Sequence, residues 1–219
     1  DASYPGGWPG YRVAYSTDQV TWRRVPDTTY ADGALRWAHT PDADVVWYAY
    51  FAPYSFERHT QLIARSQRAE GVTAHRLGDT LDGRPLDLLQ VGSADPGRLN
   101  LWFIARQHPG ETMAEWWMEG FLARLLDPFD SLARALRQQA TFWVVPNMNP
   151  DGSVRGHLRV NAAGANLNRE WHAPTAERSP EVLYTLRKMQ QTGVDLCLDV
   201  HGDEALPYAF IAGAEGTPT

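Results

Sequence analysis

The chain has 219 residues, of which 43% are hydrophobic and 11% aromatic, enough for one large domain or one domain with a smaller partner. Its formal charge is −6 and we find no run of Lys or Arg, which argues against nonspecific binding to nucleic acid or to anionic membranes. The single cysteine, Cys197, excludes an internal disulfide, and its apolar neighbours predict a buried, inert thiol. We find no signal peptide and no apolar stretch long enough to span a bilayer, so we expect a cytoplasmic protein.

The first 53 residues carry the pattern of short antiparallel strands. Tyr11, Val13 and Tyr15 alternate with polar or small neighbours, and turn residues such as Asp32-Gly33 separate the runs. We therefore expect a small antiparallel β-sandwich over residues 1–53.

After Pro53 the pattern changes to helices that alternate with apolar strands. Ser55 predicts the N-cap of a helix over about 56–68, and residues 81–84 predict the turn of a hairpin. Apolar runs over 99–105, 140–145 and 194–200 predict three buried strands. Helices are expected over 112–126 and from Ser179-Pro180-Glu181 to near Gly193, where Ser179 caps the helix and Pro180 fits its first turn. Buried strands separated by helices predict a mixed, largely parallel α/β sheet flanked by helices.

Each of the three predicted strands runs directly into polar side chains. These are His108 and Glu111 after the first strand, Asn147, Asn149 and Asp151 after the second, and His201 and Asp203 after the third. In open α/β sheets the ligand site lies beyond the carboxyl ends of the strands. We expect these clusters to converge at one edge of the sheet.

Two imidazoles and one carboxylate, from His108, Glu111 and His201, are the ligand set of a catalytic zinc site with an open coordination position. Pro109 and Gly110 disfavour a continuous helix, which predicts a turn with Glu111 near the start of the next helix. His108-x-x-Glu111 alone is also typical of a capped turn with a surface ion pair. His201 at a strand end favours the metal site.

A second candidate site is locally basic. Residues 152–172 contain Arg155, Arg159 and Arg169 against one acid, Glu170, and Asn168 adds amide donors. Each arginine alone is typical of a solvated surface. Arginine also grips a carboxylate with two parallel hydrogen bonds, so the pair of Asn168 and Arg169 favours an anion site.

Four ordered motifs resemble those of the carboxypeptidase A-like zinc metallocarboxypeptidases, and most closely the cytosolic carboxypeptidase branch. They are His108-Pro109-Gly110-Glu111, Asn149-Pro150-Asp151-Gly152, residues 166–171 (Asn-Leu-Asn-Arg-Glu-Trp) and Asp199-Val200-His201-Gly202. Residues 50–59 also resemble the junction between the β-sandwich and the catalytic domain of that branch. The resemblance implies a catalytic domain over residues 54–219.

The resemblance also implies a role for each matching residue. His108, Glu111 and His201 would hold one Zn²⁺ ion, and Arg159 would polarise the scissile carbonyl and stabilise the oxyanion. Asn168 and Arg169 would anchor the terminal carboxylate of a peptide or protein substrate. Because this branch removes C-terminal or side-chain-linked glutamates, the implied activity is hydrolysis of the C-terminal peptide bond of glutamate-ended chains.

The sequence departs from this pattern at two places. Many relatives have Asp where this chain has Asn166, and that Asp supports a zinc-bound histidine. The family's catalytic glutamate lies well downstream of the third zinc ligand, and Glu204 and Glu215 are too near His201 to match it. We therefore expect a catalytic domain without its C-terminal part and without its general base. A zinc amidohydrolase of small acyl-amino acids, a non-catalytic domain that binds acidic C-termini and a purely structural metal site are the alternatives.

Overall fold

A computed structural model describes residues 5–203, 205–206 and 208–213 of the chain. The chain divides into two compact units, one of residues 50–202 and one of residues 1–49 with 203–219. None of the helices in the described residues is long and apolar enough to cross a membrane.

The N-terminal unit consists of short antiparallel strands, as predicted. One sheet has the order β2-β1-β5, and the other pairs β3 with β4. The strands are β1 (Ala14–Ser16), β2 (Arg23–Arg24), β3 (Thr28–Ala31), β4 (Ala34–Trp37) and β5 (Trp47–Ala49), preceded by the 3-10 turn η1 (Pro5–Gly7). Asp32 and Gly33 both have positive φ, 53° and 72°, the backbone shape that closes a tight hairpin between β3 and β4. The domain boundary after residue 53 stays a prediction.

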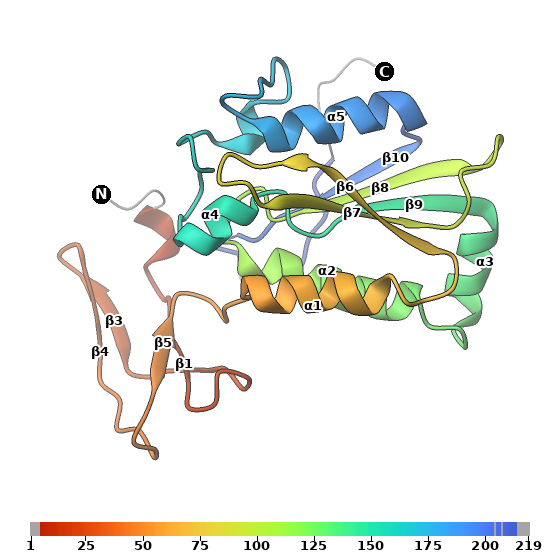
Figure 1. The fold of residues 1–219 in the computed structure, drawn as a ribbon. Coiled ribbons are helices and arrows are strands. Elements are labelled where there is room, and N and C mark those ends of the chain that lie inside the picture. Colours follow the sequence, from red (N-terminus) through yellow and green to blue (C-terminus); the bar gives the residue numbers. More distant parts are fainter. Residues whose placement is uncertain (1–4, 204, 207, 214–219) are drawn as a thin grey trace. The chain divides into compact units, whose positions relative to one another are not determined.

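The larger unit is built on a five-stranded mixed sheet of order β10-β8-β9-β7-β6 (Figure 1). Its strands are β6 (Val72–Asp79), β7 (Pro85–Val91), β8 (Leu99–Ala105), β9 (Ala140–Val145) and β10 (Leu196–Val200). β10, β8 and β9 are parallel, whereas β7 runs antiparallel to both β9 and β6. Residues 80–84 connect the antiparallel strands β6 and β7 and include the predicted turn at 81–84, which confirms the hairpin.

Helices cover both faces of this sheet, as predicted for a mixed α/β fold. They are α1 (Phe56–Ser66), α2 (Thr112–Leu125), α3 (Ser131–Gln139), α4 (Pro150–Arg155) and α5 (Pro180–Thr192). Figure 1 shows α1 and α2 on one face and α5 on the other. Side chains that alternate along β8 serve the two cores: Phe103 packs in the cluster with Met118 of α2, and Trp102 in the cluster with Val182 of α5.

The two predicted helix caps have different outcomes. Ser55 Oγ accepts a hydrogen bond from the backbone N–H of Arg58 at 3.2 Å, which confirms the cap of α1. Ser179 precedes α5, but its side chain makes no capping bond, and its buried Oγ has no hydrogen-bond partner in the described part of the chain. Pro180 starts α5 as predicted, because its fixed φ suits the first helical turn.

The third predicted strand is less buried than expected. Leu196 and Cys197 of β10 are both exposed, so the expectation of a buried strand and a buried thiol was wrong. The reason is the position of β10 at the edge of the described sheet, where β8 is its only paired strand.

Candidate functional site

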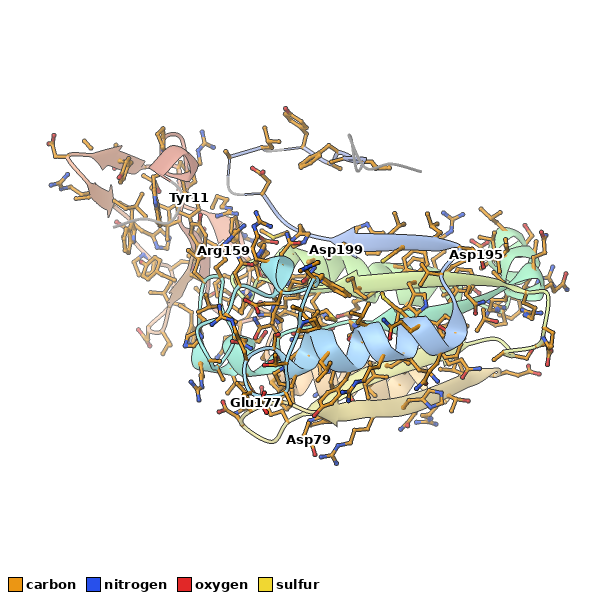
Figure 2. The ribbon with its side chains drawn as sticks, turned by 90° about the horizontal axis from the view of Figure 1, so that it is seen from above. Tyr11, Asp79, Arg159, Glu177, Asp195 and Asp199 are labelled. Carbon is orange, nitrogen blue, oxygen red and sulfur yellow. The ribbon has the colours of Figure 1, made fainter. Side chains whose placement is uncertain are left out.

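The parallel strands of the larger unit end together. Ala105 of β8 lies opposite Val200 of β10, and Ile104 lies opposite Val145 of β9. The backbone N–H of Met148 donates to Ala105 O at 2.8 Å, which ties the loop after β9 to the end of β8. The polar segments after these strands therefore start at one edge of the sheet, as predicted. In Figure 2, Asp199 and Asp195 mark opposite ends of β10, and Arg159 lies towards the Asp199 end.

The turn after β8 carries the first two candidate ligands. Glu111 is the residue before α2, and its N–H donates to His108 O at 3.1 Å, which confirms the predicted turn. Gly110 donates its N–H to Leu158 O at 2.9 Å. A Cβ at Gly110 would lie 2.6 Å from Leu158 Cδ1 and 2.8 Å from its carbonyl oxygen. Glycine is therefore required for the segment that carries Arg159 to lie against this turn.

The carboxylate of Glu111 lies between two imidazoles. His108 Nδ1 is 2.7 Å from Glu111 Oε1, and His201 Nδ1 is 2.8 Å from Glu111 Oε2. One ligand atom from each of the three residues lies within 4.8 Å of those of the other two. His108 and Glu111 are buried and His201 is half-buried, so the cluster is accessible from one side.

The outer nitrogen of each imidazole meets an oxygen acceptor. His108 Nε2 is 3.0 Å from Asn166 Oδ1, and His201 Nε2 is 2.9 Å from Asp199 Oδ2. Such a partner would hold the proton on Nε2 when a metal ion takes the place of the Nδ1 proton, so that both Nδ1 atoms could serve as ligands. Two inward nitrogens and one carboxylate fit a zinc ion with an open coordination position.

The cluster is organised around an ionised carboxylate. Burial alone would raise the pKa of Glu111, but hydrogen bonds from His108 and His201 outweigh it and lower the pKa to about 2. Burial lowers the pKa of His201, but its contacts with Asp199 and Glu111 outweigh burial and raise the pKa to about 9. Both shifts describe a site that favours positive charge beside Glu111, as a divalent cation would supply.

Of the candidate anion-binding residues, Arg159 lies beside this cluster. Arg159 Nη1 is 3.7 Å from Glu111 Oε1, and its side chain is half-buried. Asn168 lies on the short 3-10 turn η2 (Leu167–Arg169), and its backbone N–H donates to Asn166 Oδ1 at 3.2 Å. Arg169 is exposed and donates to Asn168 O at 3.1 Å. Asn166, the residue before η2, thus connects this turn to His108 of the candidate metal site.

Two other polar residues from the sequence patterns lie elsewhere. Arg155 forms an ion pair with Asp82 at 2.6 Å, so it is not part of the group around Glu111. Asp151 accepts hydrogen bonds from Thr80 and Arg84 at the β6–β7 turn. Both residues fasten α4 to the hairpin.

Three residues near the cluster were missed in the sequence: Arg106, Gln107 and Asp199. Asp199 could have been found, because residues two apart in a strand share a face, and Asp199 precedes His201 by two. Arg106 has the left-handed φ of 57°, which nothing in the sequence indicates for an arginine. Gln107 is fully buried, whereas glutamine is usually exposed.

Comparisons with known proteins agree with this geometry. Residues 60–206 match the family model described as zinc carboxypeptidase, and residues 1–51 match the cytosolic carboxypeptidase N-terminal domain. A crystal structure of a Shewanella denitrificans protein has 56% identity and a TM-score of 0.97 over 99% of this chain and 57% of that one. A metallo-carboxypeptidase from Pseudomonas aeruginosa, in complex with (2-guanidinoethylmercapto)succinic acid, has 47% identity and a TM-score of 0.89 over 94% of this chain and 55% of that one.

The chain spans little more than half the length of such relatives. An uncharacterized protein of Zymomonas mobilis is 58% identical over 218 residues, which are 100% of this chain and 56% of the relative. The zinc carboxypeptidase match itself covers well over half of the chain. With the ordered motifs and the fold, it shows that the chain belongs to the zinc carboxypeptidase family, with an N-terminal region of the cytosolic carboxypeptidase type.

Proposed function

We propose that this protein is a zinc-dependent metallocarboxypeptidase that hydrolyses the C-terminal peptide bond of peptides or proteins. One Zn²⁺ ion is held by His108, Glu111 and His201. The observation that supports this most is that both Nδ1 atoms lie within 2.8 Å of the Glu111 carboxylate while both Nε2 atoms meet outer acceptors. An ordinary surface ion pair would need neither the burial nor the outer partners.

In this proposal, the chain's own residues bind and polarise the substrate. Zinc, when bound, acts as a Lewis acid that polarises a carbonyl oxygen and makes water more acidic. Arg159, close to Glu111, points a permanent positive charge at the same region and would stabilise the oxyanion that develops on the carbonyl. We assign the general base to none of the described residues.

The terminal carboxylate of the substrate is assigned to Asn168 and Arg169. Arg169 has an exposed guanidinium, whose planar fork suits a carboxylate, and Asn168 beside it offers amide donors. Asn168 and Arg169 follow closely after Asn166, whose side chain is the partner of His108, so a carboxylate bound there would lie near the candidate metal site. Recognition of a free C-terminus rather than an internal bond depends on this pair.

An acidic residue at the cleaved end is the finer part of the proposal. The motif resemblance to the glutamate-removing branch supports it. The related Pseudomonas aeruginosa protein is in complex with a succinic acid that carries a guanidino group. A peptide that ends in a basic residue is therefore the substrate to compare with one that ends in an acidic residue. A cytoplasmic location belongs to the same proposal, and the match to the cytosolic carboxypeptidase N-terminal domain supports it.

A set of matched peptides tests this proposal. The full-length protein is incubated with one peptide ending in Glu, the same peptide ending in Arg, and the Glu peptide with an amidated C-terminus. We expect release of the terminal Glu, slower release of Arg, no release from the amidated peptide, and loss of activity with a zinc chelator. Faster release of Arg would refute the acidic preference alone. Equal cleavage of the amidated peptide would refute carboxylate recognition, and preferential cleavage of a small acyl-amino acid would favour an amidohydrolase.

A further inference from the structure

Gln107 lies directly before His108, and its side chain connects two parts of the site. We propose that Gln107 is a positioning residue that orients Asp199, and through it His201, and that joins this pair to Trp171 near the anion-binding segment. The inference rests on the proposed function, because it concerns how the chain prepares a zinc ligand.

A continuous line of hydrogen bonds carries the inference. Trp171 Nε1 donates to Gln107 Oε1 at 2.9 Å, and Gln107 Nε2 donates to Asp199 Oδ2 at 2.5 Å. The same oxygen of Asp199 lies 2.9 Å from His201 Nε2. His201 Nδ1 then faces Glu111 Oε2 at 2.8 Å. The line therefore runs from an indole to the centre of the metal cluster.

The chemistry of the partners requires an amide at this position. An indole N–H can only donate, so it needs an oxygen, and an ionised carboxylate can only accept, so it needs an N–H. The terminal amide of glutamine presents one of each, Oε1 as acceptor and Nε2 as donor. Glutamate would direct an oxygen at Asp199, and methionine would make neither bond.

Gln107 Nε2 and His201 Nε2 both lie within hydrogen-bond distance of Asp199 Oδ2. Asp199 would therefore hold the Nε2 proton of the imidazole when Nδ1 binds a metal ion. This matters more for His201 than for His108, because His201 is half-buried and follows the edge strand β10. An Asp199 side chain held in one orientation therefore limits the rotation of the imidazole of His201, the most exposed of the three proposed ligands.

The backbone holds Gln107 in place for this task. Gln107 is fully buried, and its carbonyl oxygen accepts a hydrogen bond from Asn149 Nδ2 at 3.0 Å. Trp171 packs against the core cluster beneath α5 and lies two residues after Arg169. Hydrogen bonds thus connect Trp171, next to the segment proposed to bind the substrate carboxylate, to the proposed zinc ligand His201. A movement of that segment would therefore reach His201.

The test compares three variants with a matched control. Gln107→Met removes both hydrogen bonds without adding charge, Gln107→Glu removes only the donor, and Trp171→Phe removes only the indole N–H. Gln90→Glu is the control, because Gln90 also bridges two groups, His75 and Gly92 O, but lies on β7. Zinc affinity is measured by competition with a chelator, and the free energy of unfolding is measured on the metal-free proteins.

We expect Gln107→Met and Gln107→Glu to weaken zinc binding about 10- to 100-fold, the usual effect of losing a partner that orients a ligand. Trp171→Phe should weaken it less, and should cause no further loss when combined with Gln107→Met, because both act through one line of bonds. Gln90→Glu should leave zinc affinity unchanged even if it lowers stability.

The outcomes separate this inference from the proposed function. If the wild-type protein binds no zinc, both are overturned. If it binds zinc and the Gln107 variants bind equally well, only the role of Gln107 is overturned. Additive losses from Trp171→Phe and Gln107→Met would contradict the link between the two. If a Gln107 variant fails to fold, Trp171→Phe still provides a test, because it keeps an aromatic ring in the core. Unchanged zinc affinity in Trp171→Phe would then overturn the inference.

Discussion

The guanidinium of Arg106 donates a hydrogen bond to the fully buried carboxylate of Glu115 at 2.5 Å. Arg106 also donates to Pro109 O at 3.1 Å, within the turn that carries His108 and Glu111. The second carboxylate oxygen of Glu115 contacts His59 Nδ1 at 2.7 Å. A buried charge network that includes Glu115 of α2 therefore supports the turn that carries His108 and Glu111.

Removal of this guanidinium should destabilise the fold. Arg106→Leu leaves the buried charge of Glu115 without its arginine partner, and a broken buried ion pair typically costs about 3–5 kcal/mol. Urea unfolding gives the free energy of unfolding. Arg124→Leu is the control, because Arg124 is exposed in its ion pair with Asp130, and such pairs contribute about 0–1 kcal/mol. Equal losses in the two variants would show that the buried network has no special role.

Glu181 should make the stability of the protein depend on pH. Burial is the main cause that raises its pKa to about 7 from 4.5, and repulsion from Asp151 adds to it. Its Oε1 is buried without a hydrogen-bond partner among the described residues, which also favours the protonated form. The unfolded chain releases this proton near pH 4.5, whereas the folded protein keeps it until about pH 7. The contribution of Glu181 to stability is therefore full below about pH 4.5 and is lost as pH rises to about 7.

Glu181→Gln should remove this pH dependence. We expect the variant to be more stable than wild type at pH 8, by up to about 3 kcal/mol, and to differ little near pH 4.5. Urea unfolding at several pH values measures both. Glu177→Gln, at an exposed position in the preceding loop, should leave the curve unchanged. If the free energy of unfolding falls between pH 5 and pH 7 to the same extent in wild type and in Glu181→Gln, the assignment is contradicted.

Arg159 should contribute to turnover rather than to metal binding. Arg159→Ala is expected to lower kcat about 10²- to 10³-fold, the usual effect of losing one group that stabilises an oxyanion. Zinc affinity should stay the same or rise slightly, because a positive charge 3.7 Å from Glu111 has been removed. Arg155→Ala is the control, since Arg155 pairs with Asp82. An unchanged kcat in Arg159→Ala would remove this residue from the mechanism.

Much of the site could be predicted because its residues follow local sequence patterns, such as an apolar strand that ends in polar side chains. Apolar runs followed by polar clusters predicted that parallel strands would end at one edge, and Ala105 and Val200 do lie opposite each other. Pro109 and Gly110 predicted a turn between strand and helix, and the structure has this turn. The close approach of Leu158 to Gly110 is the reason that the turn needs a glycine.

The parts that could not be predicted depend on contacts between distant segments. Arg106 has a left-handed backbone, and its side chain is held by Glu115, nine residues later, a contact that the sequence pattern does not reveal. The hydrogen bonds of the Gln107 amide depend on Asp199 and Trp171, which are distant in the sequence. The exposure of Cys197 followed from the position of β10 in the sheet, which its apolar neighbours do not reveal.

The zinc content of the metal-loaded protein tests the central claim most directly. After zinc loading and dialysis, we expect about one zinc per chain in the wild-type protein. His201→Ala should lose most of this zinc, and His75→Ala, at a histidine paired with Gln90 on the neighbouring strand, should keep it. A wild-type protein without zinc, or a His201→Ala variant that retains it with undiminished affinity, would contradict the account.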